Sequence, residues 1–238
     1  MSNPKDTIQL TAGVLGGMGP DATVDFMAKV LKLTPAATDQ DHIRMLVDNN
    51  PTVPDRQRAL LGNGESPGAA LAGMARGLEA LGADFLVMPC NTAHAWAQGI
   101  RAAVSIPLVS IIDETVLACA QYETVGLLST AGCLESGVYQ EGLKSGGKQL
   151  VLPTAEELLE IMSLVYRVKR GDSSEEVFAG MATIAQAMVD RGADVIVAGC
   201  TEIPLVLDPA RVRVPVIQST DVLAEATVAL AKGDRQLP

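Results

Sequence analysis

Residues 82–90 read GADFLVMPC, and residues 192–200 read GADVIVAGC, in register and without a gap. Two other segments repeat with them: Gly13-Val14-Leu15 is matched by Gly126-Leu127-Leu128, and residues 106–109 (IPLV) by residues 214–217 (VPVI). A single duplication at about half the chain length predicts two similar lobes, because a solenoid needs three or more short repeats.

Each repeat predicts a strand that ends at a cysteine and leads into a helix. Residues 84–88 and 194–198 are short apolar runs after a glycine, which is typical of strands buried on both faces of a parallel sheet. Helices are expected at about 67–81 and 174–191, ahead of the two strands, and at 93–104 after the first cysteine. Pro204 falls in the first turn of the helix expected after the second cysteine.

This order of elements predicts an α/β fold with two pseudo-symmetric flavodoxin-like lobes, each a parallel sheet flanked by helices. We expect residues 1–107 plus 214–238 to form the first lobe and residues 108–213 the second, with a final helix at about 220–231 returning to the first lobe. Ligands bind beyond the carboxyl ends of parallel strands, so both cysteines are expected in an active-site cleft between the lobes.

The composition of the chain excludes several classes of partner and location. With 238 residues, of which 48% are hydrophobic, the chain can bury a sizeable core. The formal net charge of -10, without any basic run, argues against nucleic acid or an anionic membrane as a partner. The N-terminal residues resemble no targeting segment, and the apolar runs are too short to span a bilayer, so we expect a cytoplasmic protein with reduced cysteines.

Cys90 and Cys200 are expected to be reactive thiols. Each follows a strand and precedes a helix N-terminus, a position that is expected to lower a thiol pKa and favour the thiolate. With one thiol on each side of a bound amino acid, a thiolate could remove the α-proton while the opposite thiol delivers another proton to the other face. No cofactor is required for that chemistry. Cys119 and Cys133 are expected to be core residues.

Five spaced motifs resemble the aspartate/glutamate racemase family, most closely its aspartate racemase branch. They are residues 15–20 (LGGMGP), 49–51 (NNP) with 54–56 (PDR), 88–94 (MPCNTAH), 136–139 (SGVY) and 198–202 (AGCTE). The resemblance covers almost the whole chain and implies that Cys90 and Cys200 are the catalytic acid/base pair. It also implies a homodimer, and reversible inversion of a small-molecule amino acid, aspartate in the L and D forms, without pyridoxal phosphate.

The resemblance implies a set of substrate-binding residues as well. Arg56 and Lys169 match the cationic residues that hold the distal carboxylate of an acidic substrate, and Arg can bind a carboxylate through two parallel hydrogen bonds. Asn91 and Thr92 are expected at the α-carboxylate, and Glu202 at the ammonium group.

Three further residues complete the expected binding set. Thr201 lies between the second cysteine and Glu202, Met18 lies in the glycine loop, and Thr130 lies in the loop that pairs with it in the second half. Glutamate racemases carry His instead of Glu after the second Cys-Thr, which favours aspartate as the substrate.

Several alternatives stay open. The chain could be a glutamate or broad-specificity racemase of the same family, a non-catalytic binding protein for a dicarboxylate or amino acid, or a decarboxylase or cis-trans isomerase of the superfamily. Residues 16–19 lack the Gly-x-Gly-x-x-Gly spacing of a dinucleotide site. His94 could line the pocket, polarise Cys90 or be a core histidine, and no ligand spacing predicts a metal.

Overall fold

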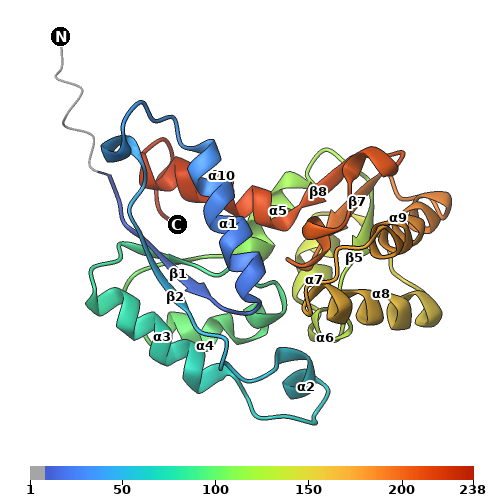
Figure 1. Ribbon diagram of the computed structural model, residues 1–238, viewed down its shortest axis with the longest axis horizontal. Coiled ribbons are helices and arrows are strands. Elements are labelled where there is room, and N and C mark those ends of the chain that lie inside the picture. Colours follow the sequence, from blue (N-terminus) through green and yellow to red (C-terminus); the bar gives the residue numbers. More distant parts are fainter. Residues whose placement is uncertain (1–8) are drawn as a thin grey trace.

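The computed structural model describes residues 9–238 and consists of two α/β lobes side by side (Figure 1). Each lobe contains a four-stranded parallel sheet, and the two sheets have the equivalent strand orders β2-β1-β3-β4 and β6-β5-β7-β8. The strands are β1 (Ala12–Gly16), β2 (Met45–Asn49), β3 (Phe85–Val87), β4 (Leu108–Val109), β5 (Thr124–Leu128), β6 (Gln149–Val151), β7 (Val195–Ala198) and β8 (Val216–Gln218). The duplicated sequence therefore corresponds to a duplicated sheet, and the predicted fold class is confirmed.

Helices flank both sheets, and the helices expected at 67–81, 174–191 and 220–231 are present as α3, α9 and α10. The α-helices are α1 (Pro20–Leu33), α2 (Arg56–Leu60), α3 (Gly68–Ala80), α4 (Ala97–Arg101), α5 (Ile111–Ala118), α6 (Ala131–Ser136), α7 (Val138–Ser145), α8 (Ala155–Val168), α9 (Glu175–Asp190) and α10 (Ser219–Ala231). Short 3-10 helices are η1 (Asp39–Asp41), η2 (Thr92–Trp96), η3 (Ile203–Leu205) and η4 (Pro209–Arg211).

The edge strands divide the chain differently from the expected ranges 1–107 plus 214–238 and 108–213. Strand β4 pairs with β3 in the first sheet, and β8 pairs with β7 in the second. Each edge strand belongs to the sheet of the repeat that precedes it, because its backbone groups complete that ladder. The chain passes between the lobes only after these strands, at α5 and α10, and α10 packs against α1 of the first lobe as expected.

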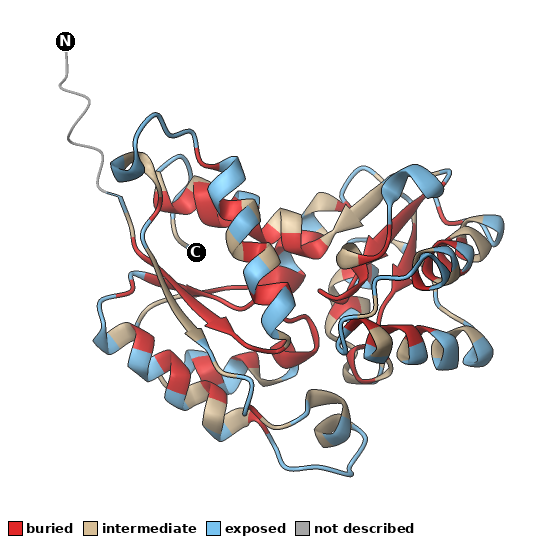
Figure 2. Ribbon diagram, viewed as in Figure 1, coloured by how far each residue is buried: buried red, intermediate tan, exposed pale blue. Residues whose placement is uncertain are grey.

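One apolar core joins the two sheets. It contains Val14 and Val87 of the first sheet, Leu127 and Val197 of the second, and Leu223 of α10, all fully buried or nearly so. Figure 2 shows the buried central strands in both lobes. Helices α5 and α10 contribute to this core and pack against each other. The two lobes therefore share one continuous hydrophobic core.

The Gly-Ala-Asp of each repeat has a structural role. Gly82 and Gly192 end the preceding helices in the left-handed conformation, with φ of +92° and +101°. Asp84 and Asp194 then accept hydrogen bonds from backbone N–H groups at the start of β1 and β5, at 2.6 and 3.2 Å. These three residues therefore turn the chain out of a helix and tie the new strand to its neighbour.

The repeated glycines of β1 and β5 allow close contact between strands. A Cβ at Gly13 would lie 2.8 Å from Cδ2 of Leu86, and a Cβ at Gly126 would lie 2.5 Å from Cδ1 of Ile196. Both distances are shorter than van der Waals contact, so a larger residue would displace the neighbouring core side chain.

We predict that Gly126→Ala lowers the free energy of unfolding by about 1–3 kcal/mol, because the added methyl group overpacks the core against Ile196. The matched control is Gly77→Ala on the exposed face of α3, where nothing lies within 4 Å of the added Cβ. That control should raise stability by about 0.5–1 kcal/mol. Urea denaturation measures both changes, and equal effects of the two substitutions would contradict the packing argument.

Candidate active site

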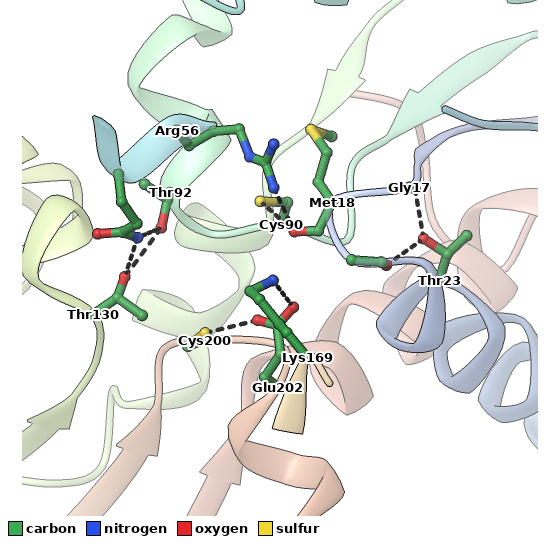
Figure 3. A network of polar contacts seen from close by, with 12 residues as sticks. Gly17, Met18, Thr23, Arg56, Cys90, Thr92, Thr130, Lys169, Cys200 and Glu202 are labelled. Carbon is green, nitrogen blue, oxygen red and sulfur yellow. Dashed lines mark hydrogen bonds and ion pairs between the residues drawn. The ribbon is translucent and has the colours of Figure 1, made fainter. Parts of the chain in front are cut away.

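A single cleft between the lobes brings together all ten residues that the sequence predicts for the site, and Figure 3 labels all of them except Asn91 and Thr201. They are Met18, Arg56, Cys90, Asn91, Thr92, Thr130, Lys169, Cys200, Thr201 and Glu202. Helix α8 adds an apolar wall that the sequence analysis did not identify, formed by Met162, Val165 and Tyr166. The cleft therefore combines two thiols, two cations and a buried carboxylate beside a hydrophobic surface.

The two thiols have different partners. Cys90 and Cys200 are both buried and follow β3 and β7, the equivalent central strands of the two sheets. The Cys90 thiol points to the carbonyl of Met18, with Sγ 3.6 Å from the oxygen. The Cys200 thiol donates to Oε2 of Glu202 at 3.0 Å. Cys90 thus contacts a neutral acceptor and Cys200 a carboxylate.

The expectation that a helix N-terminus lowers the thiol pKa is wrong for Cys200. Burial raises the pKa of Cys200 well above its ordinary value, and the negative charge of Glu202 raises it further. The element that follows is only the short 3-10 helix η3, with Pro204 at its start, so little helix dipole is available to oppose these effects. Cys200 therefore rests as a protonated thiol at neutral pH.

Lys169 and Glu202 form an ion pair in the cleft. Lys169 directly follows α8, and its Nζ contacts Oε1 of Glu202, whose side chain is almost fully buried. Burial is the largest single influence and would lower the pKa of Lys169, but the charge of Glu202, the nearby thiols and the hydrogen bond to Glu202 together outweigh it, so the net shift is upward. Glu202 therefore receives a charged donor on one oxygen and the Cys200 thiol on the other.

Arg56 is held by backbone carbonyls. Its Nη1 donates to the carbonyls of Val53 and Pro54, both at 3.0 Å, and its Nη2 donates to that of Met18 at 3.2 Å. Within residues 9–238 these bonds use three of the five guanidinium donors, which leaves Nε–H and one Nη2–H for a ligand. The Met18 carbonyl also accepts from Cys90, so Arg56 and the first thiol share one acceptor (Figure 3).

Gln57, the residue after Arg56, joins the two lobes across the cleft. Its Nε2 donates to Oγ1 of Thr130 at 2.8 Å and to Oγ1 of Thr92 at 3.3 Å, while its Oε1 accepts from the backbone N–H of Gly132 at 2.6 Å. The two threonine oxygens are 3.2 Å apart. The sequence analysis missed Gln57, and its place next to Arg56 was the only signal that could have identified it.

The Asn91 side chain is largely committed to the protein. Its Oδ1 accepts from the hydroxyl of Tyr139, and its Nδ2 donates to Oγ of Ser219 at 3.1 Å. Ser219 in turn donates to the carbonyl of Ala198 at 3.0 Å. This buried chain ties the segment after Cys90 to the end of β7, and leaves one Nδ2–H of Asn91 for a ligand.

His94 is a core histidine. Its Nδ1 lies 2.9 Å from the carbonyl oxygen of Cys90, and its Nε2 lies 3.3 Å from the backbone nitrogen of Ile111. A backbone N–H can only donate, so Nε2 accepts, and Nδ1 therefore carries the hydrogen and donates to Cys90. Burial lowers the pKa of His94 to about 4, so the ring is neutral at physiological pH. His94 contacts the backbone of Cys90, and the thiol contacts Met18 instead.

The remaining cysteines lie outside the cleft lining. Burial raises the pKa of Cys119 to about 11 and that of Cys133 to about 12, which makes both thiols poor nucleophiles. Over residues 9–238, no three His, Cys, Asp or Glu side chains are arranged to bind a metal ion. In the same part of the chain no helix is long and apolar enough to cross a bilayer.

Comparison with known proteins identifies the family of this chain. The model of the family described as Asp/Glu/hydantoin racemase matches residues 15–227. The chain belongs to this family. It is 30% identical to the broad-specificity amino-acid racemase RacX of Bacillus subtilis, over 91% of this chain and 96% of RacX. As a member of this family, the protein is an enzyme of the amino-acid racemase class.

Solved structures share the two-lobed fold of this racemase-family member. The aspartate racemase of Picrophilus torridus superposes with a TM-score of 0.85 at 32% identity, covering 96% of both chains. The glutamate racemase of Francisella tularensis, solved with D-glutamate, has a TM-score of 0.70 at 17% identity and covers 95% of this chain and 82% of its own. The second similarity concerns the fold alone.

The pKa of His94 is 6.5 in the unfolded chain, and burial lowers it to about 4 in the folded protein. The imidazole therefore binds a proton more tightly in the unfolded chain than in the folded one. The contribution of neutral His94 to the free energy of unfolding is fully present above pH 6.5. The free energy of unfolding falls by at most about 3 kcal/mol as the pH drops to about 4. Urea denaturation of the wild type and of His94→Gln, between about pH 7 and pH 4, isolates this contribution. A variant with the wild-type pH slope would contradict the assignment.

Proposed function

We propose that the protein racemises an acidic amino acid, aspartate, without pyridoxal phosphate, by proton transfer between Cys90 and Cys200. The observation that carries the proposal is the placement of two thiols from equivalent strand ends of opposite lobes in one cleft that also holds two cations. Similarity to the aspartate racemase of Picrophilus torridus supports the substrate class.

In the proposed reaction, a thiolate removes the α-proton, and the electron pair of the broken C–H bond stays on the α-carbon. The opposite thiol then delivers its proton to the other face, which inverts the centre and leaves the two sulfurs with exchanged protonation states. Cys200 suits the role of initial donor, because burial and Glu202 raise its pKa. Cys90 would then be the initial base, and the roles reverse after each turnover.

The cleft offers separate partners for the charged groups of aspartate. The two remaining donors of Arg56 can form a fork on the distal carboxylate, and Lys169 can add a second positive charge. When Lys169 binds that carboxylate, Glu202 is free to accept the ammonium group. The remaining Nδ2–H of Asn91 and the Thr92 hydroxyl would contact the α-carboxylate.

A broad-specificity racemase is the second candidate, and a specific feature favours it. Met162, Val165 and Tyr166 give the cleft an apolar wall that an acidic side chain does not need, and RacX is a broad-specificity relative. A binding protein without turnover would need the cations but not two opposed thiols.

The same proposal includes a homodimer, by analogy with the family, and a reducing compartment such as the cytoplasm that keeps the thiols free.

We predict that Cys90→Ala and Cys200→Ala each lower racemisation of aspartate by about 10²–10⁴-fold, because each removes one of the two proton carriers. Cys119→Ala is the matched control and should leave the rate unchanged. The assay follows loss of optical activity and α-deuterium incorporation with L-aspartate in deuterated water, without pyridoxal phosphate. Full racemisation by either active-site variant would refute the two-thiol mechanism.

We predict that Arg56→Ala weakens aspartate binding by roughly 2–5 kcal/mol, or about one and a half to three and a half orders of magnitude, because the distal carboxylate loses its desolvated partner. Arg56→Lys should restore only part of the affinity, since a lysine cannot form the fork, and Lys169→Ala should have a similar or smaller effect. The measurement is kcat and KM for aspartate, alanine and asparagine. Loss of the bond from Arg56 to the Met18 carbonyl would affect all three substrates, whereas loss of the carboxylate contact affects aspartate alone.

The exposed Arg58 on the same helix provides the control substitution Arg58→Ala, which should change none of these values. Equal losses for acidic and neutral substrates in Arg56→Ala would show that Arg56 serves the structure and not dicarboxylate recognition.

A further inference from the structure

We propose that His94 is a positioning residue that aims the Cys90 thiol at the substrate by holding the Cys90 carbonyl through a buried hydrogen bond. This inference rests on the proposed acid/base role of Cys90. The anchor is the neutral imidazole ring, which donates from Nδ1 to the Cys90 carbonyl and accepts at Nε2 from Ile111, the first residue of α5.

The bond to His94 fixes the direction of the Cys90 side chain. The Cys90 N–H donates to the carbonyl of Met88 at 2.8 Å, and the Cys90 carbonyl accepts from His94 at 2.9 Å. With both backbone polar groups bonded, rotation about the Cys90 backbone would break a buried hydrogen bond. The Cα–Cβ bond therefore keeps one orientation, with Sγ against the Met18 carbonyl in the cleft.

The other end of the anchor lies in the core that joins the lobes. Ile111 is fully buried, and α5 packs against α10 and α7. Ser110 caps this helix by accepting from the N–H of Asp113 at 3.1 Å, so the Ile111 N–H is satisfied by His94. The bond from Ile111 therefore fixes the tautomer of the ring, with the hydrogen on Nδ1, where it can donate to the Cys90 carbonyl.

The second lobe holds its thiol in a different way. In the duplicated sequence Pro204 stands where His94 stands, four residues after the cysteine, and a proline has no side-chain donor or acceptor. Cys200 is instead held through its own Sγ by Glu202 at 3.0 Å. A change at His94 should therefore affect proton transfer at Cys90 while leaving Cys200 in place.

Two substitutions separate the two bonds of the ring. An asparagine amide reaches about the position of Nδ1, so His94→Asn can keep the bond to Cys90 and loses the one to Ile111. A glutamine amide reaches about the position of Nε2, so His94→Gln can keep the bond to Ile111 and loses the one to Cys90. Ser110→Ala is the matched control, because it weakens the start of α5 without touching the Cys90 carbonyl.

The decisive measurement is the α-deuterium isotope effect on kcat/KM for each enantiomer of aspartate. We expect His94→Gln to lower kcat about tenfold with little change in KM, because misplacing one thiol slows a single proton transfer. The isotope effect should rise for the enantiomer whose proton goes to Cys90 and fall for the other. His94→Asn and Ser110→Ala should keep nearly the wild-type isotope effects.

A second measurement needs no turnover, so it separates this inference from the proposed function. Alkylation by iodoacetamide, followed for each cysteine by peptide mass spectrometry, should be about fivefold or more faster at Cys90 in His94→Gln, because the released thiol is more exposed. The rate at Cys200 should stay within about twofold. Wild-type protein that exchanges no α-proton would refute the racemase proposal, while this alkylation result would still decide the role of His94.

Equal isotope-effect changes for both enantiomers, or an unchanged Cys90 alkylation rate in His94→Gln, would overturn the inference. The inference would also be overturned if Ser110→Ala changed the isotope effects and the Cys90 alkylation rate as His94→Gln does. Those changes would then reflect only a weakened start of α5. If His94→Gln does not fold, His94→Asn provides the test, since a large change of the Cys90 alkylation rate with the carbonyl bond retained would refute the positioning role.

Discussion

Two thiols on separate lobes can act on opposite faces of one carbon only if the lobes hold a fixed distance, and the shared apolar core sets that distance. Helices α5 and α10 each leave an edge strand of one sheet and pack against each other between the lobes. Because close-packed interiors deform little, this arrangement places the ends of β3 and β7 at a constant separation. The functional cleft is therefore a consequence of how the two halves share their core.

Polar contacts transmit this fixed geometry to the site. The chain from Tyr139 through Asn91 to Ser219 is buried and links the segment after Cys90 with the end of β7. Such a network is stable only when all of its members are bonded, which favours a single arrangement of the cleft base. Gln57 performs a similar function at the opening, where it joins α2 to the second lobe.

The cleft contains two positively charged side chains, although the whole protein carries a net negative charge. The chain carries a net charge of -10, which would repel a dicarboxylate at long range, so the proposed recognition of aspartate depends on cations at short range. Arg56 and Lys169 are both engaged before any ligand arrives, Arg56 by carbonyls and Lys169 by Glu202. The Lys169 cation keeps the buried Glu202 carboxylate from remaining unpaired, and in the proposed reaction Glu202 would change partners when substrate binds.

The sequence by itself determined the two-lobed α/β fold, the central strands and all ten predicted cleft residues. The explicit duplication predicted the two lobes, and parallel topology places Cys90, Cys200 and the residues after them at one edge. Arg56 and Lys169, which begin and follow helices, were expected from the resemblance to the racemase family. The tertiary structure alone decided the edge-strand assignment, the upward pKa shift of Cys200, and the roles of Gln57 and His94. These features depend on contacts between distant segments, such as Asn91 with Ser219, 128 residues apart, which no local pattern records. Burial and partner charges arise only when such segments meet, and they determine how each thiol behaves.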